Sequence, residues 1–434
     1  MNFKYKFSVI VPCYNSEKFL KETLDNLLGQ TLKEIQIITV NDGSTDSTAD
    51  IIAEYSANNT NILSLYQENA GVSAARNNGI DHAEGKYTTF LDSDDLFSEN
   101  ALEAMYNALE ETGADLGIYR LMRFGYGGTE FNPIVDSLAK DKHIDCYDKR
   151  LLWNFLCNKC YRTELLQKSG IRFPSLRYSE DGAFFMQFVY KTQPKITGIY
   201  DAVLKYRRLA PEQGYSVSQR IELELVEHFS RSHELIYDAA NASFYDKNCD
   251  NPEDYLQEIL NKNFTALVNE FYRSLWRGDD ETVAFIGKKA SEIRGKMTSE
   301  TKKKCSNVIK DIGEPIFSKS EIAKKPFVSV IAKKPSKDFI HTLYAQTMPV
   351  FELITAENTD LPKHENITFL TSRSFKKFAK KTAKGKITII LKGNEHLDMR
   401  FLKVISLLKR SPKFGILPDF VIKFGALLFL KIKK

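Results

Sequence analysis

TTFLDSDDL, residues 88–96, is the stretch of the sequence that decides the fold. Its first four residues are apolar or β-favouring and predict a short buried strand. Three carboxylates follow at the end of that strand, on Asp92, Asp94 and Asp95. Acids this close together repel one another unless a cation or a set of N–H donors offsets their charge. Hard divalent cations such as Mg²⁺ and Mn²⁺ favour carboxylate oxygens and keep positions open for a phosphate-bearing partner.

The same acids also suit the start of a helix, where Asp94 or Ser98 would act as the cap. The apolar positions of that helix are Leu102, Met105, Tyr106 and Leu109. The stretch alone leaves both interpretations open, and the rest of the chain decides between them.

The composition is ordinary for a globular chain of two or three domains, with 434 residues, 43% hydrophobic and 27% charged. The apolar run at residues 7–12 is too short for a signal peptide, and no apolar stretch approaches the ~20 residues of a membrane span. Six irregularly spaced cysteines do not suit a disulfide framework. We therefore expect a reducing, cytoplasmic location.

Charge is distributed unevenly along the chain. Residues 301–434 contain 28 Lys and Arg and 11 Asp and Glu, which gives a net charge of +17. Residues 1–300 contain 33 Lys and Arg and 45 Asp and Glu, which gives a net charge of −12. The two parts should therefore meet different partners. Anionic membrane lipid, an anionic polymer or nucleic acid would each suit the basic part. No nucleic-acid-binding motif is recognised there, so nucleic acid is not an expected partner.

β-favouring runs predict three strands before the opening stretch, at residues 7–11, 35–40 and 62–66. Pro12 is expected to end the first strand. Ser16 is expected to cap the helix that follows, which carries a leucine stripe and ends at a glycine.

Alternation of strands and helices indicates a parallel, doubly wound α/β sheet. Ligands of such sheets bind beyond the carboxyl ends of the strands. Residues 12–17, Asp42 and residues 92–95 each fall at such an end. The sequence therefore predicts that these three segments converge on one crevice.

Four motifs carry a specific resemblance to a known family. They are SVIVPCYNSEKFL from residue 8, VNDGSTD from residue 40, ENAGVSAARNNG from residue 68 and FLDSDD from residue 90. In this order they resemble the nucleotide-sugar-binding half of the family 2 glycosyltransferases, which have the GT-A fold, a Rossmann-like mixed sheet. The resemblance continues through NKCYR (158–162), RYSEDGAFF (177–185) and YRRLAPEQGYSVS (206–218), so it covers roughly the first half of the chain.

The resemblance implies a bacterial-type enzyme that moves a hexose or N-acetylhexosamine from a UDP-sugar to a hydroxyl group. The acceptor would be a cell-surface polysaccharide, a teichoic acid, a lipid-linked glycan or a glycoprotein. The transfer would invert the configuration of the sugar and would use Mn²⁺ or Mg²⁺. The identity of the sugar and the choice among these acceptors stay open.

The resemblance also implies a donor site built from the strand-end motifs. Asp42 would accept the uracil N3–H, and Asp94 would bind the cation through the diphosphate of the donor. Arg76 would neutralise a diphosphate oxygen or hold Asp92 in place, with a surface salt bridge as the alternative. Asp92 itself would face the ribose. The other residues assigned to the nucleotide sugar are Pro12, Tyr14, Asn15, Glu17, Gly71, Ser93 and Arg207.

Glu180 and Asp181 stand where inverting members of the family carry the catalytic base. A base is needed because the acceptor hydroxyl must lose its proton as it attacks the anomeric carbon. The resemblance favours Asp181 as the base and Glu180 as a supporting acid, and a cap for the helix that follows is the alternative. One of the two residues Arg207 and Arg208 would contact the diphosphate. An insertion at residues 210–214 leaves open which of them does so.

Three further features have simple explanations. Cys157 and Cys160 form a lone CxxC without the second ligand pair of a structural zinc site. Trp153 and Tyr161 would either line an acceptor site or pack in the core. An apolar stripe with helical spacing at residues 256–275 is typical of packing or of a subunit interface, and the latter would imply a homo-oligomer.

The end of the chain repeats features of its beginning. FVSVI at 327–331 is similar to FSVI at 7–10, and AKGK at 383–386 is similar to AEGK at 83–86. The acids that follow the earlier AEGK have a lysine and an amide as counterparts, which cannot replace two anionic ligands of a divalent cation. This pattern predicts a degenerate, non-catalytic half-repeat of the nucleotide-binding fold, with chance similarity as the alternative.

Three domains are therefore predicted. Residues 1–218 form a GT-A catalytic domain, made of a nucleotide-sugar half (1–95) and an acceptor half (96–218). Residues 219–325 form a helical linker domain, and residues 326–434 form the basic repeat. The end of that repeat is basic and amphipathic, and such segments can lie on an anionic membrane. The expected location is therefore the cytoplasm, with peripheral contact to the inner face of the cell membrane.

Two other classes of protein compete with this interpretation. A sugar-phosphate nucleotidyltransferase would need a glycine-rich GxGTR-like loop after the first strand, and PCYNSEK does not supply one. A non-catalytic glycan-binding or scaffold protein would have disrupted acidic motifs. The front half retains its acids at Asp92, Asp94 and Asp181.

Overall fold

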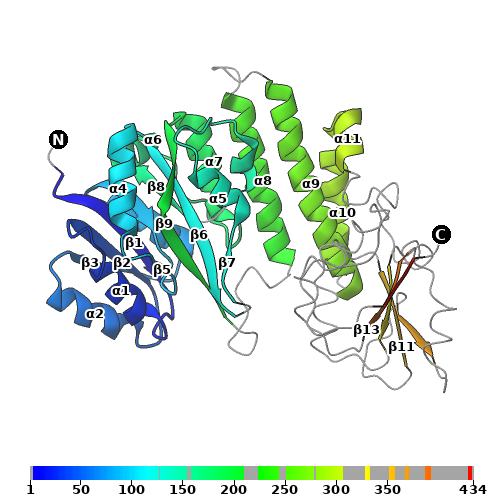
Figure 1. Cartoon of the computed structure of the whole chain (residues 1–434), viewed down its shortest axis with the longest axis horizontal. Helices are drawn as coiled ribbons and strands as arrows, with labels where there is room; N and C mark the ends of the chain where they lie inside the picture. Colours follow the sequence, from blue (N-terminus) through cyan, green and yellow to red (C-terminus); the bar gives the residue numbers. More distant parts are fainter. Residues whose placement is uncertain are drawn as a thin grey trace. The chain divides into compact units, whose positions relative to one another are not determined.

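A computed structural model describes most of the first 305 residues and five strands beyond them (Figure 1). The described residues are 3–126, 128–153, 158–209, 223–243, 251–277, 280–305, 328–332, 351–356, 367–370, 387–391 and 429–432. The chain divides into two compact units, residues 1–220 with 227–259, and residues 221–226 with 260–434. The predicted domain boundaries at 218 and 325 stay predictions.

One mixed sheet forms the framework of the first unit, with its strands in the order β3-β2-β1-β4-β8-β6-β9-β5 and β7 paired to β6. The strands are β1 (Tyr5–Cys13), β2 (Ile35–Asp42), β3 (Ile62–Gln67), β4 (Gly85–Phe90), β5 (Leu96–Phe97), β6 (Leu116–Gly125), β7 (Glu130–Phe131), β8 (Lys159–Arg162) and β9 (Ile196–Arg208). Strands β1 to β4 pair with one another in parallel, whereas β8 is antiparallel to both β4 and β6. The doubly wound α/β sheet is confirmed.

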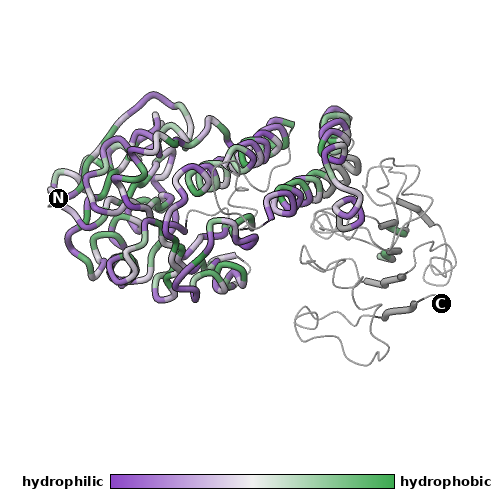
Figure 2. Tube along the Cα trace, turned by 90° about the horizontal axis from the view of Figure 1, so that it is seen from above, coloured by the Kyte–Doolittle hydropathy of each residue, from purple (hydrophilic) through white to green (hydrophobic). Residues whose placement is uncertain are grey.

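Helices pack on both faces of this sheet. They are α1 (Leu20–Leu28), α2 (Thr48–Asn58), α3 (Val72–Asp81), α4 (Ala101–Thr112), α5 (Pro133–Ala139), α6 (Thr163–Ser169), α7 (Glu180–Thr192) and α8 (Leu223–Ser243). A short 3₁₀ turn, η1 (Lys149–Trp153), follows α5. Hydrophobic and hydrophilic residues are interleaved along the helices, as expected of elements buried on one side only (Figure 2).

Alternate residues of β1 enter two separate hydrophobic cores. Val9 and Val11 pack in one core with the leucines of α1 and α4. Ile10 packs in the other core, which contains the apolar residues of α3 and the aromatic residues Phe184 and Phe188 of α7. Strands buried on both faces read as continuous apolar runs, and this explains why residues 7–11 contain no polar alternation beyond Ser8.

Pro12 does not end β1, contrary to the prediction. The strand continues to Cys13, and Pro12 stands opposite Val40 of β2. Pairing between β1 and β4 ends at Ile10 and Phe90. Because Pro12 lies beyond that last pair, its missing N–H costs the sheet no hydrogen bond on that side.

The predicted side-chain caps are also wrong. The Oγ of Ser16 is 2.7 Å from the Oγ of Ser93, and only the backbone carbonyl of Ser16 accepts a bond from the Leu20 N–H. Helix α4 begins after Asn100, without a side-chain cap, so neither Asp94 nor Ser98 caps it. The acids after β4 are therefore not explained as a helix start.

The second unit contains the end of α9 (Pro252–Arg277), α10 (Asp280–Gly295), α11 (Ser299–Cys305) and a five-stranded sheet. Its strands are β10 (Val328–Ala332), β11 (Phe351–Ala356), β12 (Ile367–Leu370), β13 (Ile387–Leu391) and β14 (Phe429–Ile432). They run in the order β12-β11-β10-β13-β14, and only β14 is antiparallel to its neighbour.

Four strands of the second sheet repeat the order of the first, since β12-β11-β10-β13 matches β3-β2-β1-β4. The segments between these strands, including the lysine cluster at 376–386, lie outside the described residues. The predicted half-repeat therefore stays a prediction.

The apolar stripe on α9 is buried at Leu256, Leu260, Phe264 and Leu267, so packing explains this part of it. Of the helices described here, none has both the length and the hydrophobicity required to cross a membrane.

Candidate active site

The loops that follow β1 and β2 are joined by hydrogen bonds at the carboxyl edge of the sheet. Asn15 has a positive φ of 49°, and its Oδ1 accepts a bond of 2.9 Å from the Thr45 N–H. The Oε2 of Glu17 accepts a bond of 3.1 Å from the Ser47 N–H. Both side chains therefore shape these loops, and their predicted contacts with a nucleotide sugar stay predictions. Tyr14 beside them is 52% exposed.

Asp42 at the end of β2 holds the segment that leads into α3. Its Oδ1 accepts bonds from Gln67 Nε2 (2.7 Å) and from the Ala70 N–H (2.9 Å), and its Oδ2 accepts one from the Gly71 N–H (2.9 Å). Gly71 has a φ of 89°, which favours glycine. A carboxylate offers about four acceptor positions. Asp42 is 3% exposed, and its predicted contact with the uracil N3–H stays a prediction.

The three acids after β4 are crowded and partly withdrawn from water. Burial and the neighbouring Asp92 raise the pKa of Asp94 to about 6. Asp95 is only 2% exposed, and burial together with the charges of Asp94 and Asp92 raises its pKa well above the usual value. Folding keeps these carboxylates together despite their repulsion, which indicates a site for positive charge.

Arg207 at the end of β9 connects this acidic loop to α1. Its Nε donates to the Asp94 carbonyl (2.7 Å), its backbone N–H donates to Asp95 Oδ1 (2.8 Å), and its Nη2 bonds to Glu22 Oε2 (2.7 Å). Of the two arginines at the end of β9, Arg207 is thus the one that the structure shows bonded to the acidic loop. Its contact with a diphosphate stays a prediction, as does that of Arg208, because the insertion at 210–214 lies outside the described residues.

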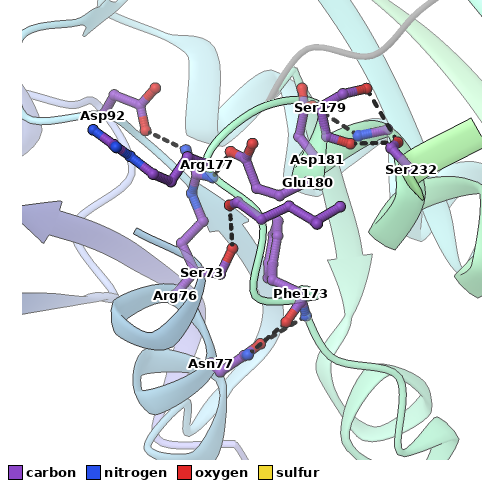
Figure 3. A network of polar contacts seen from close by, with 12 residues as sticks. Ser73, Arg76, Asn77, Asp92, Phe173, Arg177, Ser179, Glu180, Asp181 and Ser232 are labelled. Carbon is purple, nitrogen blue, oxygen red and sulfur yellow. Dashed lines mark hydrogen bonds and ion pairs between the residues drawn. The ribbon is translucent and has the colours of Figure 1, made fainter. Parts of the chain in front are cut away.

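Arg76 of α3 joins the acidic loop to the start of α7 (Figure 3). The residue is 3% exposed. Its Nη2 is 2.8 Å from Asp92 Oδ1, and its Nη1 is 2.7 Å from Glu180 Oε1. The guanidinium also lies over the ring of Phe173, at 5.3 Å from the centroid. Of the predicted roles, holding Asp92 in place is confirmed, and the alternative of a surface salt bridge is wrong.

Helix α7 begins at Glu180 and places Asp181 in its first turn. The cap position is Ser179, which has a positive φ of 60°, so Asp181 is not the helix cap. The Oγ of Ser232, on α8, donates to the Ser179 carbonyl at 2.7 Å and lies 3.1 Å from the Ser179 Oγ. The Oδ1 of Asp181 accepts a bond of 2.7 Å from the Gly182 N–H. The candidate base is therefore held by a rigid helix start (Figure 3).

The pKa of Asp181 is raised to about 7. Burial is the main cause and the charge of Glu180 adds to it, whereas Lys159 and Arg76 act in the opposite direction. A carboxylate with a pKa near neutrality can exchange a proton under ordinary conditions.

A small pocket with room for about one water molecule lies beside this carboxylate. It is lined by Phe90, Lys159, Tyr161, Phe173, Asp181, Phe184 and Phe185. Tyr161 is 3% exposed and packs against the rings of Phe90 and Phe184, so the core interpretation of Tyr161 is confirmed. The side chain of Trp153 lies outside the described residues.

Sequence reasoning missed three residues of this site. Lys159 was visible only inside the NKCYR motif, although a lysine in a strand beside buried residues is itself a signal. Ser232 lies on α8, in the part of the chain expected to be a linker. Asp95 was recognised as an acid, but its bond to the Arg207 backbone depends on the pairing of β5 with β9.

The described residues contain no cluster of three or more His, Cys, Asp or Glu side chains arranged to hold a metal ion. Cys160 is buried, which raises the pKa of its thiol, and Cys157 lies outside the described residues. Mg²⁺ is usually bound by one or two carboxylates together with phosphates and waters. Asp94, with Asp92 beside it, is a donor set of this kind. Burial is the main cause of the raised pKa of Asp94 and repulsion by Asp92 adds to it, and a cation there would offset that repulsion.

The sequence model of the family described as glycosyl transferase family 2 matches residues 8–170. Glycosyltransferase GlyG of Streptococcus pneumoniae is 33% identical over 214 residues, which cover 46% of this chain and 70% of GlyG. The chain therefore belongs to the family 2 glycosyltransferases, as its motifs predict.

Two further relatives extend this comparison. Glycosyltransferase GlyA of Streptococcus pneumoniae is 33% identical over 216 residues, 46% of this chain and 30% of GlyA. TarS of Staphylococcus aureus, a poly(ribitol-phosphate) beta-N-acetylglucosaminyltransferase, is 29% identical over 238 residues, 51% of this chain and 40% of TarS. The chain spans about a third to a half of the length of the first curated relatives it matches.

The fold has the same counterpart among solved structures. The crystal structure of TarS matches with a TM-score of 0.50 at 25% identity, over 62% of this chain and 48% of TarS. Residues 1–349 of TarS in complex with UDP match with a TM-score of 0.51 at 23% identity, over 66% of this chain and 88% of that one. The predicted GT-A fold is confirmed by this likeness.

Proposed function

We propose that this protein transfers a hexose or N-acetylhexosamine from a UDP-sugar to a hydroxyl group of a cell-surface glycan or polymer, with inversion at the anomeric carbon. One observation carries the proposal. A single buried guanidinium, that of Arg76, bonds to Asp92 of the donor loop and to Glu180 beside the candidate base. The residues expected to grip the donor and the residue expected to activate the acceptor are thus parts of one connected site.

The donor would lie along the loops that follow β1, β2 and β4. Asp42 uses three of its acceptor positions within the chain and offers the remaining one to the uracil N3–H. A divalent cation, Mn²⁺ or Mg²⁺, bound at Asp94 would offset the charge on the departing nucleotide diphosphate. Arg207 holds the acidic loop in shape through its bonds to Asp94 and Asp95.

The acceptor would be activated by Asp181. The acceptor oxygen forms a bond to the anomeric carbon on the face opposite the diphosphate, the bond from that carbon to the diphosphate oxygen breaks, and the hydroxyl proton passes to the Asp181 carboxylate. With its pKa near 7, Asp181 is ionised at slightly alkaline pH and is still a useful proton acceptor. Transfer should therefore slow as the pH falls below about 7.

The nature of the acceptor is suggested by the relatives and by the charge of the chain. TarS is named for transfer to poly(ribitol-phosphate), which is an anionic polymer. The net charge of +17 on residues 301–434 would attract such a polymer or an anionic membrane. We propose that this basic part holds an anionic acceptor or the membrane surface at the cytoplasmic face, while the first unit carries out the transfer.

The test is release of UDP from a panel of UDP-hexoses and UDP-N-acetylhexosamines by the full chain, with Mn²⁺ and with chelator. We expect turnover with one sugar, loss of turnover with chelator, and loss of the metal effect in Asp94→Ala. Asp181→Asn should abolish transfer and keep donor binding, and Asp81→Asn, an exposed acid on α3, is the matched control. Full transfer by Asp181→Asn would remove Asp181 from its role.

A separate measurement addresses the basic part. Binding of the full chain and of a chain ending at Ser318 to poly(ribitol phosphate) and to anionic vesicles should differ, with weaker binding by the shorter chain. Equal binding by the two chains would show that the basic part does not recruit either partner. If the full chain binds UDP but releases none from any UDP-sugar, the chain is a binding protein on a transferase fold.

A further inference from the structure

We infer that Lys159 of β8 is a positioning residue that keeps the Asp181 carboxylate ionised inside its apolar pocket. The inference rests on the proposed function, since it takes Asp181 to be the base of the transfer. It adds to that function a residue outside the strand-end motifs, on a strand from the other half of the sheet.

The first support is the place of the lysine. Lys159 is 2% exposed and is among the largest fully buried side chains of the protein. It lines the same small pocket as Asp181, whose other walls are the rings of Phe90, Tyr161, Phe173, Phe184 and Phe185. The Nζ of Lys159 lies 4.4 Å from the centre of the Phe185 ring. An ammonium group in such surroundings is costly unless a negative charge compensates it.

The second support is the fixed position of the ammonium group. The Nζ donates to Asn158 Oδ1 at 3.2 Å, and the Lys159 carbonyl accepts a bond of 2.9 Å from Thr89 Oγ1 on β4. The lysine is therefore tied to the strand that ends in the acidic loop. A cation held in this way stabilises a nearby anion without reorganising when the proton arrives.

The third support is the balance of charge around Asp181. The charged groups that act on it are Glu180 on its own helix, Lys159 on β8 and Arg76 on α3. Arg76 already bonds to two carboxylates, those of Asp92 and Glu180. Among the described residues named here, Asp92, Glu180 and Asp181 lie near the two cations, and Lys159 is the one that lines the pocket of Asp181. Without it, burial and the charge of Glu180 would favour the protonated, inactive form of Asp181.

The first arm of the test is the pH profile of transfer by Lys159→Met, Lys159→Arg and the control Lys168→Met, an exposed lysine on α6. We expect the acid limb of kcat for Lys159→Met to move up by about one pH unit. Its rate at pH 6.5 would then be about tenfold below that of the wild type and would recover at pH 9. Lys159→Arg should keep most of the wild-type profile, and donor KM should stay constant. A wild-type acid limb in Lys159→Met would overturn the inference.

The second arm needs no activity, so it separates this inference from the proposed function. The free energy of unfolding in urea at pH 8 is measured for Lys159→Met, Asp181→Asn and the double variant of the full chain. We expect Lys159→Met to change the unfolding equilibrium constant at least tenfold less in the Asp181→Asn background than in the wild type. Lys159→Gln, which keeps a donor to Asn158, replaces Lys159→Met if the latter does not fold. Additive effects of the two changes would refute the charge coupling even if the enzyme is active.

Discussion

Replacing the candidate base should make the ligand-free protein more stable at alkaline pH while it abolishes transfer. The pKa of Asp181 is raised from 3.8 to about 7, chiefly by burial, and a shift of this size corresponds to about 4 kcal/mol. The residue is partly exposed, so screening by water reduces the effect, and we expect about 2 kcal/mol. Asn at this position keeps an acceptor for the Gly182 N–H, which bonds to Asp181 Oδ1 at 2.7 Å. It also removes the carboxylate charge, whose attraction to Lys159 and Arg76 is already included in the net upward shift of the Asp181 pKa.

The sign of the pH dependence follows from the two states. Below pH 3.8 the side chain is protonated in both the folded and the unfolded chain, so the charge costs nothing. Between 3.8 and about 7 only the unfolded chain loses the proton, so the wild type loses stability relative to Asp181→Asn as the pH rises. Above about pH 7 the difference is constant.

The assay is urea denaturation of wild type, Asp181→Asn and the control Asp81→Asn from pH 5 to pH 8. The advantage of Asp181→Asn should grow up to about pH 7 and then level off, whereas the exposed control should have little effect. A variant that is less stable than the wild type at pH 8, or a difference that does not change with pH, would refute the reasoning about burial.

Other substitutions test the contacts around the site. Arg76→Met should lower the free energy of unfolding by about 3 kcal/mol, because it leaves two carboxylates without their buried cation, and an unchanged melting temperature would contradict this. Ser232→Ala should lower kcat about tenfold with UDP binding unchanged, because the Ser179 carbonyl loses its donor and the start of α7 is positioned less well. An equal loss of UDP binding would argue against a positioning role for Ser232. Gly85→Ala should destabilise the protein by about 2 kcal/mol, since a Cβ there would lie 2.4 Å from the Ser8 nitrogen. Gly295→Ala, where a Cβ would meet open space, is the control and should leave the melting temperature unchanged.

The parallel half of the fold could be predicted because β1 and β2 are buried on both faces and because β3, which is exposed on one face, is still rich in β-favouring residues. Each of the runs at 7–11, 35–40 and 62–66 falls within a strand of the structure. The order of the strands in the other half of the sheet could not be predicted from the sequence. The strands β6, β8 and β9 are adjacent in the sheet but distant in sequence, and only long-range pairing selects their order. Local rules also failed at Pro12, where the position of the neighbouring strand decides whether a proline is tolerated.

The acids of the candidate site could be recognised from their motifs, but their environments could not. Nothing in the sequence shows that Arg76 is buried or that it bonds to Glu180, which is 104 residues away. The role of Ser232 depends in the same way on the packing of α8 against the start of α7. Burial and charge spacing are properties of the assembled fold, and they set the proton affinity of Asp181.

The bridge made by Arg76 limits how the chain can be recombined. A chimera that takes its first ninety-odd residues from another family member brings a new α3 and a new acidic loop, but it keeps the original start of α7. Such an exchange preserves the bridge only when the incoming segment has an arginine where this chain has Arg76 and the recipient has an acid at Glu180. Swapping of donor specificity between relatives is therefore constrained by Arg76, whose partner Glu180 lies 104 residues further along the chain and outside the exchanged segment.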